Sequence, residues 1–186
     1  EGLSVRLVEA QSGLGGVWQA NRYPGARVDS HVPNYEFSME PCWRDWVWSE
    51  RFPGRDELVR YFEHIDRALD LSRDIDLETR IKTCRFDGQG SWTLIAEGGR
   101  RYSCSMLLIC TGFGSIPYTP DLPGLKSFAG TCHHTATWPE DGVDFLGKRV
   151  GVIGTGASGV QVIQEVAPLA ERLTVFQRTP NTALPM

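Results

Sequence analysis

The sequence predicts an α/β fold. Residues 148–177 alternate between a β-rich run, a glycine-rich loop, a helical stretch and a second β-rich run, and residues 4–9 form another short β-rich run. Residues 75–110 contain several short strands with glycine-rich turns, the last of them at 106–110. The apolar spacing over residues 55–70 is typical of an amphipathic helix. Because strands that alternate with helices favour parallel sheets, we expect parts of two strand–helix–strand units with a small β-meander insertion.

Length, composition and charge favour a globular protein. The chain has 186 residues, of which 41% are hydrophobic and 23% charged, and its formal net charge is −4. This charge gives no support for nucleic-acid binding, and no apolar run approaches the roughly 20 residues of a membrane span. The five cysteines form no Cys-x-x-Cys pair, which argues for a reducing compartment and against a zinc site or disulfide framework. We therefore expect a cytoplasmic protein without a metal site.

A glycine motif at residues 154–159 predicts a dinucleotide-binding turn. Gly154, Gly156 and Gly159 form G-x-G-x-x-G. The first glycine permits a tight turn, the second lets the backbone approach a pyrophosphate, and the third allows close packing of helix on strand. The candidate cofactor contacts in this turn are Gly154, Thr155, Gly156, Ala157, Ser158 and Gly159.

The surroundings of this motif make it specific. Val150, Val152 and Ile153 are expected to form a buried strand before it. A helix follows over about residues 158–169, and a second strand runs over residues 173–177. The helix N-terminus offers N–H groups and its dipole to phosphates. This order is that of a Rossmann-like unit.

The residues at the tip of the second strand indicate which dinucleotide binds. An acid at this position takes the ribose 2′-OH of NAD, whereas an arginine accommodates the 2′-phosphate of NADP. The chain has Arg178 and Thr179 there and no acid. A guanidinium binds a phosphate in bidentate fashion, so we expect NADP(H). The alternative is that Arg178 is an ordinary solvated surface arginine.

Residues 4–9 predict a second unit of the same kind. The strand expected over Ser4–Glu9 ends in an acid, which the second strand of a Rossmann-like unit needs for a ribose. Its own glycine motif should lie about 20 residues earlier, before residue 1. We therefore expect the first unit to begin upstream of this chain. The alternative is an edge strand that ends in a solvated glutamate.

Three motifs, in order, resemble those of the flavin-dependent Baeyer–Villiger monooxygenases, relatives of the flavin-containing monooxygenases. Residues 15–18 (GGVW) and 21–29 (NRYPGARVD) resemble the family's flavin-contacting stretch, and residues 175–181 (VFQRTPN) resemble the segment after its NADPH motif. Residues 128–140 (FAGTCHHTATWPE) match the family fingerprint F-x-G-x-x-x-H-x-x-x-W-P-[D/E]. The fingerprint positions are Phe128, Gly130, His134, Trp138 and Pro139. The resemblance covers essentially the whole chain.

The resemblance also implies roles for individual residues. The implied FAD contacts are Glu9 at a ribose, the loop residues Gly16, Val17 and Trp18, and Tyr35 near the cofactor. Asp29 is implied as a catalytic acid near the flavin ring that pairs with an essential arginine, and Arg27 and Asp29 would also face the nicotinamide nucleotide. The chain departs from the family at residues 18–20, which read WQA instead of the frequent Trp-Tyr-Trp.

The fingerprint histidine allows two interpretations. Adjacent side chains such as His133 and His134 do not converge on one ion, so a metal site is not expected. By resemblance, the fingerprint connects the flavin and NADP domains and acts on their relative motion. Alternatively, His134 and Trp138 simply pack and hydrogen-bond the linker. We do not assign His134 as a general base.

The reaction that the resemblance implies uses FAD, NADPH and O₂. NADPH reduces FAD, and the reduced flavin forms a C4a-peroxyflavin that converts a small-molecule ketone to an ester or lactone. The family's stabilising arginine lies beyond these 186 residues, so we expect the chain to be part of a larger enzyme and inactive alone.

The implied organisation consists of parts of two Rossmann-like nucleotide-binding domains. Residues 1–127 would belong to the FAD domain, 128–142 to a linker that contains the fingerprint, and 143–186 to the start of the NADP domain. Two alternative functions are an N- or S-oxidising flavin monooxygenase and a nucleotide-binding module without catalysis. The Trp138-Pro139 pair and the run at residues 22–27 (RYPGAR) favour the Baeyer–Villiger branch.

Overall fold

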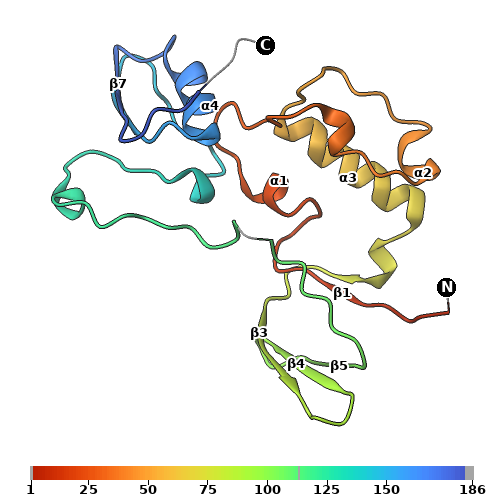
Figure 1. Ribbon diagram of the computed structural model, residues 1–186. Coiled ribbons are helices and arrows are strands. Elements are labelled where there is room, and N and C mark those ends of the chain that lie inside the picture. Colours follow the sequence, from red (N-terminus) through yellow and green to blue (C-terminus); the bar gives the residue numbers. More distant parts are fainter. Residues whose placement is uncertain (1, 113, 183–186) are drawn as a thin grey trace. The chain divides into compact units, whose positions relative to one another are not determined.

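The computed structural model describes residues 2–112 and 114–182 (Figure 1). These residues divide into two units that are interleaved along the chain. The first unit contains the chain up to Gln19, Phe37–Trp46 and Val59–Ile116. The second contains Ala20–Glu36, Val47–Leu58 and the chain from Pro117 onward. Across the described ranges, no helix combines the length and the apolar character that a membrane span requires.

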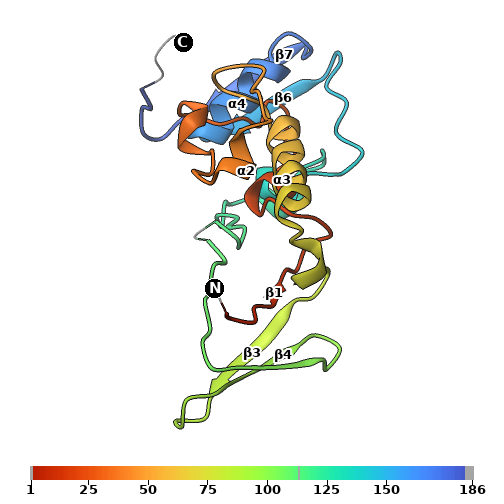
Figure 2. The same cartoon turned by 90° about the vertical axis from the view of Figure 1, so that its right-hand side faces the viewer.

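A parallel strand–helix–strand element forms the centre of the second unit. Strand β6 (Arg149–Ile153) pairs in parallel with β7 (Arg172–Phe176), and helix α4 (Ala157–Val166) connects them (Figure 2). The predicted order is therefore confirmed. The helix ends three residues before the predicted end at residue 169, because Pro168 lacks a backbone N–H and restricts the residue before it.

The core of the second unit lies where α4 packs against β6 and the loop at residues 22–28. The buried members of this core are Tyr23, Ala26, Val162 and Val166, with Trp138, Phe145, Val150, Val152, Ala170 and Leu173 packed around them. Ile153 was predicted to be buried, but its side chain is 64% exposed. The reason is the two-residue period of a strand: Val150 and Val152 share the core face, and Ile153 points away from it.

Short 3₁₀ turns shape the remaining segments of this unit. They are η1 (Val32–Asn34), η3 (Leu125–Ser127) and η4 (Thr135–Thr137).

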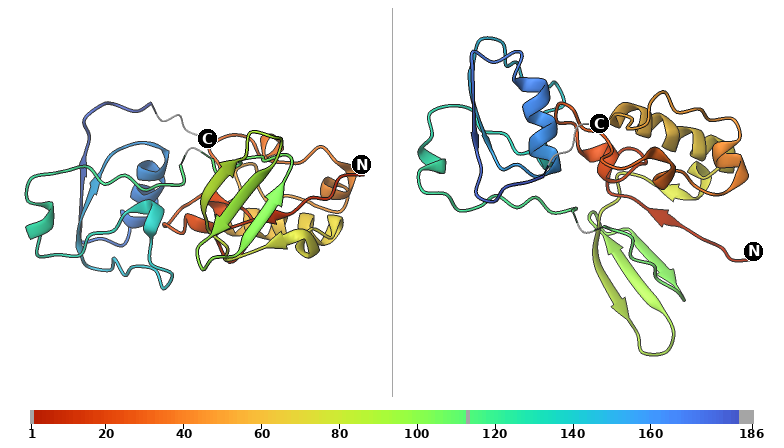
Figure 3. Two further views of the ribbon diagram at one scale, coloured as in Figure 1. Left: turned by 90° about the horizontal axis from the view of Figure 1, so that it is seen from below. Right: turned by 45° about the horizontal axis from the view of Figure 1, so that its top comes forward.

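The first unit contains two small sheets. Strand β1 (Leu7–Val8) pairs in parallel with β2 (Ile75–Asp76). Strands β3 (Ile81–Phe86), β4 (Trp92–Ala96) and β5 (Arg101–Cys104) form an antiparallel meander in that order, as predicted (Figure 3).

The strand predicted at residues 106–110 is absent. The side chains of Met106, Leu108 and Ile109 are 65%, 86% and 70% exposed. A strand needs a hydrogen-bonding partner for its backbone, and no described strand pairs with this segment. Strand β1 is likewise shorter than the predicted run at residues 4–9. Among the described strands it pairs with β2 alone, and that ladder covers Leu7 and Val8.

The helices of the chain before residue 70 are α1 (Val17–Ala20), α2 (Glu40–Trp43) and α3 (Arg55–Leu69). The predicted amphipathic helix is confirmed as α3, and two of its predicted apolar positions, Leu58 and Ile65, are buried. Tyr61 is fully buried as well, which the apolar spacing did not indicate. Its hydroxyl accepts a hydrogen bond from the backbone N–H of Phe37 at 2.9 Å, so its polar atom is satisfied.

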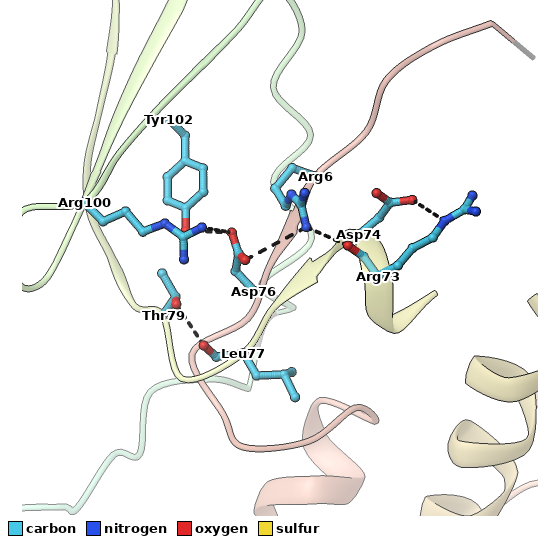
Figure 4. Close-up of polar contacts among 8 residues, drawn as sticks. All are labelled: Arg6, Arg73, Asp74, Asp76, Leu77, Thr79, Arg100 and Tyr102. Atoms are coloured by element: carbon cyan, nitrogen blue, oxygen red, sulfur yellow. Dashed lines mark hydrogen bonds and ion pairs between the residues drawn. The ribbon is translucent and has the colours of Figure 1, made fainter. Parts of the chain in front are cut away.

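One carboxylate links β2 to the meander in the first unit (Figure 4). Asp76 Oδ2 accepts a hydrogen bond from the Tyr102 hydroxyl at 2.9 Å and lies 3.0 Å from Arg100 Nη2. Arg6 Nη1 lies 4.0 Å from Asp76 Oδ1 and donates to the carbonyl of Arg73 at 3.0 Å. Burial raises the pKa of Tyr102, and its hydrogen bond to Asp76 raises it further.

We predict that Tyr102→Phe lowers the free energy of unfolding by about 1–2 kcal/mol at pH 7, because a hydrogen bond to a carboxylate is lost. The pKa of Tyr102 is raised in the folded protein, so this stabilisation is complete below the phenol's ordinary pKa of about 10. It is lost as pH rises through the folded value. Urea unfolding at pH 7 and at pH 11 measures both effects. Tyr118→Phe, at a 77% exposed position, serves as the control. Equal stabilities of Tyr102→Phe and the unmodified protein at pH 7 would contradict the assignment.

Candidate functional site

The three glycines of the motif lie where a phosphate-binding turn needs them. Gly154 has a φ of +101°, and its N–H donates to the carbonyl of Phe176 at 2.9 Å. A Cβ on Gly159 would lie 2.4 Å from the carbonyl oxygen of Gly154, so only glycine lets the helix pack this closely. A Cβ on Gly156 would meet no atom within 4 Å. The second glycine therefore faces open space, into which a ligand can approach the backbone.

Helix α4 presents its N-terminus at this turn. Gly156 is the N-cap residue, and no side chain caps the helix. The first N–H groups of a helix lack carbonyl partners within the helix, so Ala157 and its neighbours can bind an anion through their backbone. The Ser158 hydroxyl donates instead to the hydroxyl of Tyr23 at 3.2 Å. The donor that Ser158 can offer to a phosphate is therefore its backbone N–H.

Arg178 and Thr179 follow the end of β7. The carbonyl of Phe176 binds Gly154, so the strand end lies beside the first glycine. Arg178 is two residues further along the chain, and both it and Thr179 are exposed. Arg178 and Thr179 thus follow, by two and three residues, the strand residue whose carbonyl binds Gly154.

A second candidate loop runs from Glu9 to Trp18 in the first unit. The backbone N–H of Glu9 donates to the carbonyl of Asp76 at 2.9 Å, which fixes Glu9 directly after β1. Its Oε1 accepts from the N–H of Gln11 at 2.8 Å, and Gln11 Nε2 donates to the carbonyl of Gly16 at 3.0 Å. Gln11 therefore connects two predicted cofactor contacts, Glu9 and Gly16, within one folded loop.

The tip of this loop needs two glycines. Gly15 and Gly16 have φ values of +115° and +55°, which side chains rarely adopt. A Cβ on Gly15 would lie 3.2 Å from the ring of Phe62 on α3, whereas a Cβ on Gly16 would meet nothing within 4 Å. Val17 follows with 51% of its side chain exposed, and Trp18 is half-buried. The loop thus presents an open backbone at Gly16 beside an accessible apolar side chain.

Asp29 and Tyr35 lie together in the second unit. The Tyr35 hydroxyl donates to Asp29 Oδ1 at 3.4 Å. Arg27 Nη1 lies 3.9 Å from Glu50 Oε2, and the Arg27 side chain is partly exposed. Val28, the residue between Arg27 and Asp29, is 1% exposed. The buried Val28 thus anchors a segment whose flanking charged residues, Arg27 and Asp29, reach solvent.

The segment that carries Arg27 is held against α4 by Gln161, a residue that no sequence motif indicated. The buried Gln161 accepts from the Tyr23 hydroxyl through Oε1 at 2.9 Å. Its Nε2 donates to the carbonyl of Arg27 at 3.0 Å. One feature of the sequence could have indicated this role: Gln161 is a polar residue between Val160 and Val162, on the first turns of a helix with an apolar core face.

The fingerprint has a structural explanation at its first two positions. A Cβ on Gly130 would lie 2.7 Å from the ring of Phe128. The F-x-G spacing therefore lets the Phe128 ring lie over the backbone of Gly130.

His134 binds two backbone groups at once. Its Nδ1 accepts from the N–H of Ala136 at 3.1 Å, which makes it the N-cap of η4, and its Nε2 lies 3.1 Å from the carbonyl of Tyr118. Both ring nitrogens are engaged, so neither is free to act as a base in this arrangement. His133 contacts the ring of Trp138 instead, with centroids 5.6 Å apart. The two histidines thus point to different partners, and within the described ranges no three His, Cys, Asp or Glu side chains are grouped to hold a metal ion.

The end of the fingerprint contacts both the core and the RYPGAR run. Trp138 packs against the core cluster of the second unit, with its ring centroid 6.1 Å from that of Phe145. Two residues later, Glu140 Oε1 lies 2.5 Å from Arg22 Nη1. Two of the motifs found in the sequence are therefore joined by an ion pair.

The family model for flavin-binding monooxygenase-like proteins matches residues 1–184. The chain belongs to this flavin-binding monooxygenase-like family. It is 46% identical to the cyclopentanone 1,2-monooxygenase of Comamonas sp. and 47% identical to the acetone monooxygenase (methyl acetate-forming) of Gordonia sp.. Both matches cover 100% of this chain, but 34% and 35% of those proteins. The chain thus spans about a third of the length of these family members.

Solved structures of family members share the fold. An oxidized steroid monooxygenase bound to NADP has a TM-score of 0.91 at 47% identity, over 99% of this chain and 36% of that one. An ε-caprolactone-bound cyclohexanone monooxygenase has a TM-score of 0.92 at 36% identity, over 99% and 36% of the two chains. The arrangement described above is therefore that of a mixed α/β part of this family's fold.

We predict that Gly159→Ala destabilises the protein by about 1–3 kcal/mol, because its Cβ would overpack the turn against a backbone carbonyl. Gly156→Ala should change the free energy of unfolding by less than about 0.5 kcal/mol. The alanine meets no atom there, and a weaker N-cap is offset by a less flexible unfolded chain. Chemical unfolding of both variants tests this pair. Equal losses of stability in the two variants would contradict the close packing of α4 on the turn.

Proposed function

We propose that this chain is part of an FAD-containing, NADPH- and O₂-dependent monooxygenase that converts a small-molecule ketone to an ester or lactone. The observation that carries the proposal is the 47% identity, over the whole chain, to a monooxygenase that forms methyl acetate from acetone by its name. That conversion inserts one oxygen atom beside a ketone carbonyl. The fingerprint and the RYPGAR run, joined by the Arg22–Glu140 pair, support the same branch of the family.

The proposed organisation has two Rossmann-like nucleotide-binding domains. Residues 1–127 belong to the FAD domain, 128–142 to the linker and 143–186 to the start of the NADP domain. The parallel β6–α4–β7 element and the parallel β1–β2 pair support this division. Residues 20–36 and 47–58 of the proposed FAD domain pack in the same unit as the chain from Pro117 onward. The meander of β3–β5 would be the small insertion, within residues 1–127.

The residues present fit FAD. Glu9 would hold the ribose through its carboxylate, which Gln11 already orients. The backbone at Gly16 is open to a ligand, and Val17 and Trp18 follow it as a wall. When bound, the flavin supplies the redox and oxygen chemistry, and the protein binds, orients and shields it.

Asp29 and Arg27 would act nearest the chemistry. Asp29, held by Tyr35, would pair with an arginine from elsewhere in the enzyme and so orient it. Arg27 and Asp29 would also face the nicotinamide nucleotide.

The residues around α4 fit a nicotinamide dinucleotide phosphate. The uncapped helix N-terminus and the open face of Gly156 would bind the pyrophosphate. Arg178 and Thr179 would bind the 2′-phosphate of NADPH, because a guanidinium and a hydroxyl are donors and no acid stands there to repel it.

We predict that Arg178→Ala raises the KM for NADPH by about 10- to 100-fold and leaves the KM for NADH nearly unchanged. The reason is the loss of a charge-assisted contact of about 1.5–3 kcal/mol with the 2′-phosphate. Steady-state kinetics with both nucleotides measure the difference. Arg172→Ala, an exposed position at the start of β7, is the matched control. Equal effects of Arg178→Ala on the two nucleotides would rule out the 2′-phosphate contact.

We predict that His134→Ala slows flavin reduction or the step after it, while FAD remains bound. The substitution removes the contact with the Tyr118 carbonyl, which connects the fingerprint to the segment before it, and the contact with the N–H of Ala136 inside the fingerprint. A hinge there must absorb backbone changes. Stopped-flow absorbance, with flavin content measured on the same sample, tests this; Cys132→Ala at the neighbouring exposed position is the control.

Other results for His134→Ala would favour other roles. Loss of folding or of flavin would indicate a structural role alone. Normal reduction with an impaired oxygen-transfer step and a shifted pH profile would indicate a base. Normal rates in both steps would eliminate a role in domain motion.

The intact enzyme tests the proposed reaction directly. We expect a yellow protein that oxidises NADPH in the presence of a ketone and releases an ester or lactone with one additional oxygen atom. Oxidation of amines or sulfides instead would place it with the N- or S-oxidising monooxygenases. A colourless protein that does not oxidise NADPH would indicate a nucleotide-binding module.

A further inference from the structure

The loop at residues 22–28 is fixed between two parts of the second unit. On one side its backbone binds residues 53–55: the N–H of Val28 donates to the carbonyl of Pro53 at 3.2 Å, and the N–H of Arg55 donates to the carbonyl of Ala26 at 2.8 Å. On the other side it packs against α4. A Cβ on Gly25, whose φ is +78°, would lie 2.7 Å from the carbonyl oxygen of Gln161. The loop therefore lies as close to the helix as a backbone allows.

Gln161 binds this loop at two points four residues apart. Its Oε1 accepts from the Tyr23 hydroxyl and its Nε2 donates to the carbonyl of Arg27, at 2.9 and 3.0 Å. The Tyr23 hydroxyl also accepts from Ser158 Oγ at 3.2 Å. The result is one continuous hydrogen-bonded path, which we call the loop clamp: Ser158, Tyr23, Gln161 and the carbonyl of Arg27.

A purely packing role would not require a glutamine. Gln161 is 8% exposed and lies beside Val162 and Val166 of the core, where an apolar side chain would pack without the desolvation of an amide. The amide fixes the position of the loop along the helix, because its oxygen and its nitrogen each bind a different group of the same loop. Buried polar groups can fix one arrangement among several apolar ones in this way.

We propose that Gln161 is a positioning residue that holds Arg27 in a fixed place relative to the phosphate-binding end of α4. This inference rests on the proposed function, in which Arg27 faces the nicotinamide nucleotide and the N-terminus of α4 binds its pyrophosphate. The same helix then carries the phosphate site at residues 156–159 and, at residue 161, the side chain that sets Arg27. Binding of the nucleotide and placement of the loop at residues 22–28 are thus coupled through α4 itself.

The clamp acts on geometry and not on nucleotide affinity. The pyrophosphate would bind backbone N–H groups at the start of α4, and Gln161 contributes none of these. Loss of its amide frees the carbonyl of Arg27, so the loop can shift while the phosphate site stays intact. A shift of about 1 Å in a positioning group can slow a reaction by about 100-fold. The affected quantity is therefore the rate of flavin reduction at saturating NADPH, and not the dissociation constant of NADPH.

The test uses the intact enzyme with the variants Gln161→Met and Gln164→Met. Methionine keeps the length of the side chain and removes both hydrogen bonds, and Gln164 is an exposed glutamine on the same helix. Stopped-flow reduction by NADPH gives the limiting rate and the dissociation constant, and flavin content is measured on the same samples. We expect Gln161→Met to lose at least about 10-fold in the limiting rate, with a dissociation constant within about 3-fold and full flavin content. Gln164→Met should match the unmodified enzyme.

Other outcomes overturn the proposal. An unchanged limiting rate in Gln161→Met does so, as does a loss that appears only as weaker NADPH binding or lower flavin content. If Gln161→Met does not fold, Tyr23→Phe removes a single donor from the clamp and should lower the limiting rate by about 3-fold; an unchanged rate there also overturns it. Failure of the proposed function is distinct, because the unmodified enzyme would then fail to reduce its flavin with NADPH.

Discussion

The close approach of α4 to two backbone segments determines how the second unit is built. Gly159 lets the helix pack on the turn at Gly154, and Gly25 lets the loop at residues 22–28 lie against the same helix at Gln161. Neither position has room for a Cβ. Helix α4 is therefore held by backbone contacts at both glycines, which constrain its position more than side-chain packing alone could. The orientation of its N-terminus, and of the loop that carries Arg27, follows from these two contacts.

The other motifs of the second unit gather around this helix. Trp138 of the fingerprint belongs to the cluster that packs on its core face, and Glu140 binds Arg22 at the start of the loop. His134 contacts the segment before the fingerprint at the Tyr118 carbonyl, and it caps the N–H of Ala136 inside the fingerprint. Segments that are more than 100 residues apart in sequence thus share one core. In the first unit, the Asp76 carboxylate links the parallel strand pair to the meander.

The sequence predicted the parts that depend on local rules. The G-x-G-x-x-G turn, the helix at residues 55–69 and the antiparallel meander follow from glycine spacing, apolar periodicity and turn residues. The predicted strand at residues 106–110 was wrong because a strand depends on a partner elsewhere, and Ile153 was assigned to the core although strand alternation turns it outward. The roles of Gln161 and Tyr23 were not predicted, because they depend on a hydrogen bond between residues that are 138 positions apart in the sequence. No local pattern marks such a pair.

We expect three segments to respond together when the nicotinamide nucleotide binds: the glycine turn, the first turns of α4 and the RYPGAR loop. Amide hydrogen exchange of the intact enzyme, measured with and without NADP⁺, tests this most directly. Residues 154–161 and 22–28 should gain protection together, while the strands of the meander at residues 81–104 should not change. Protection of residues 154–161 with no change at 22–28 would contradict it.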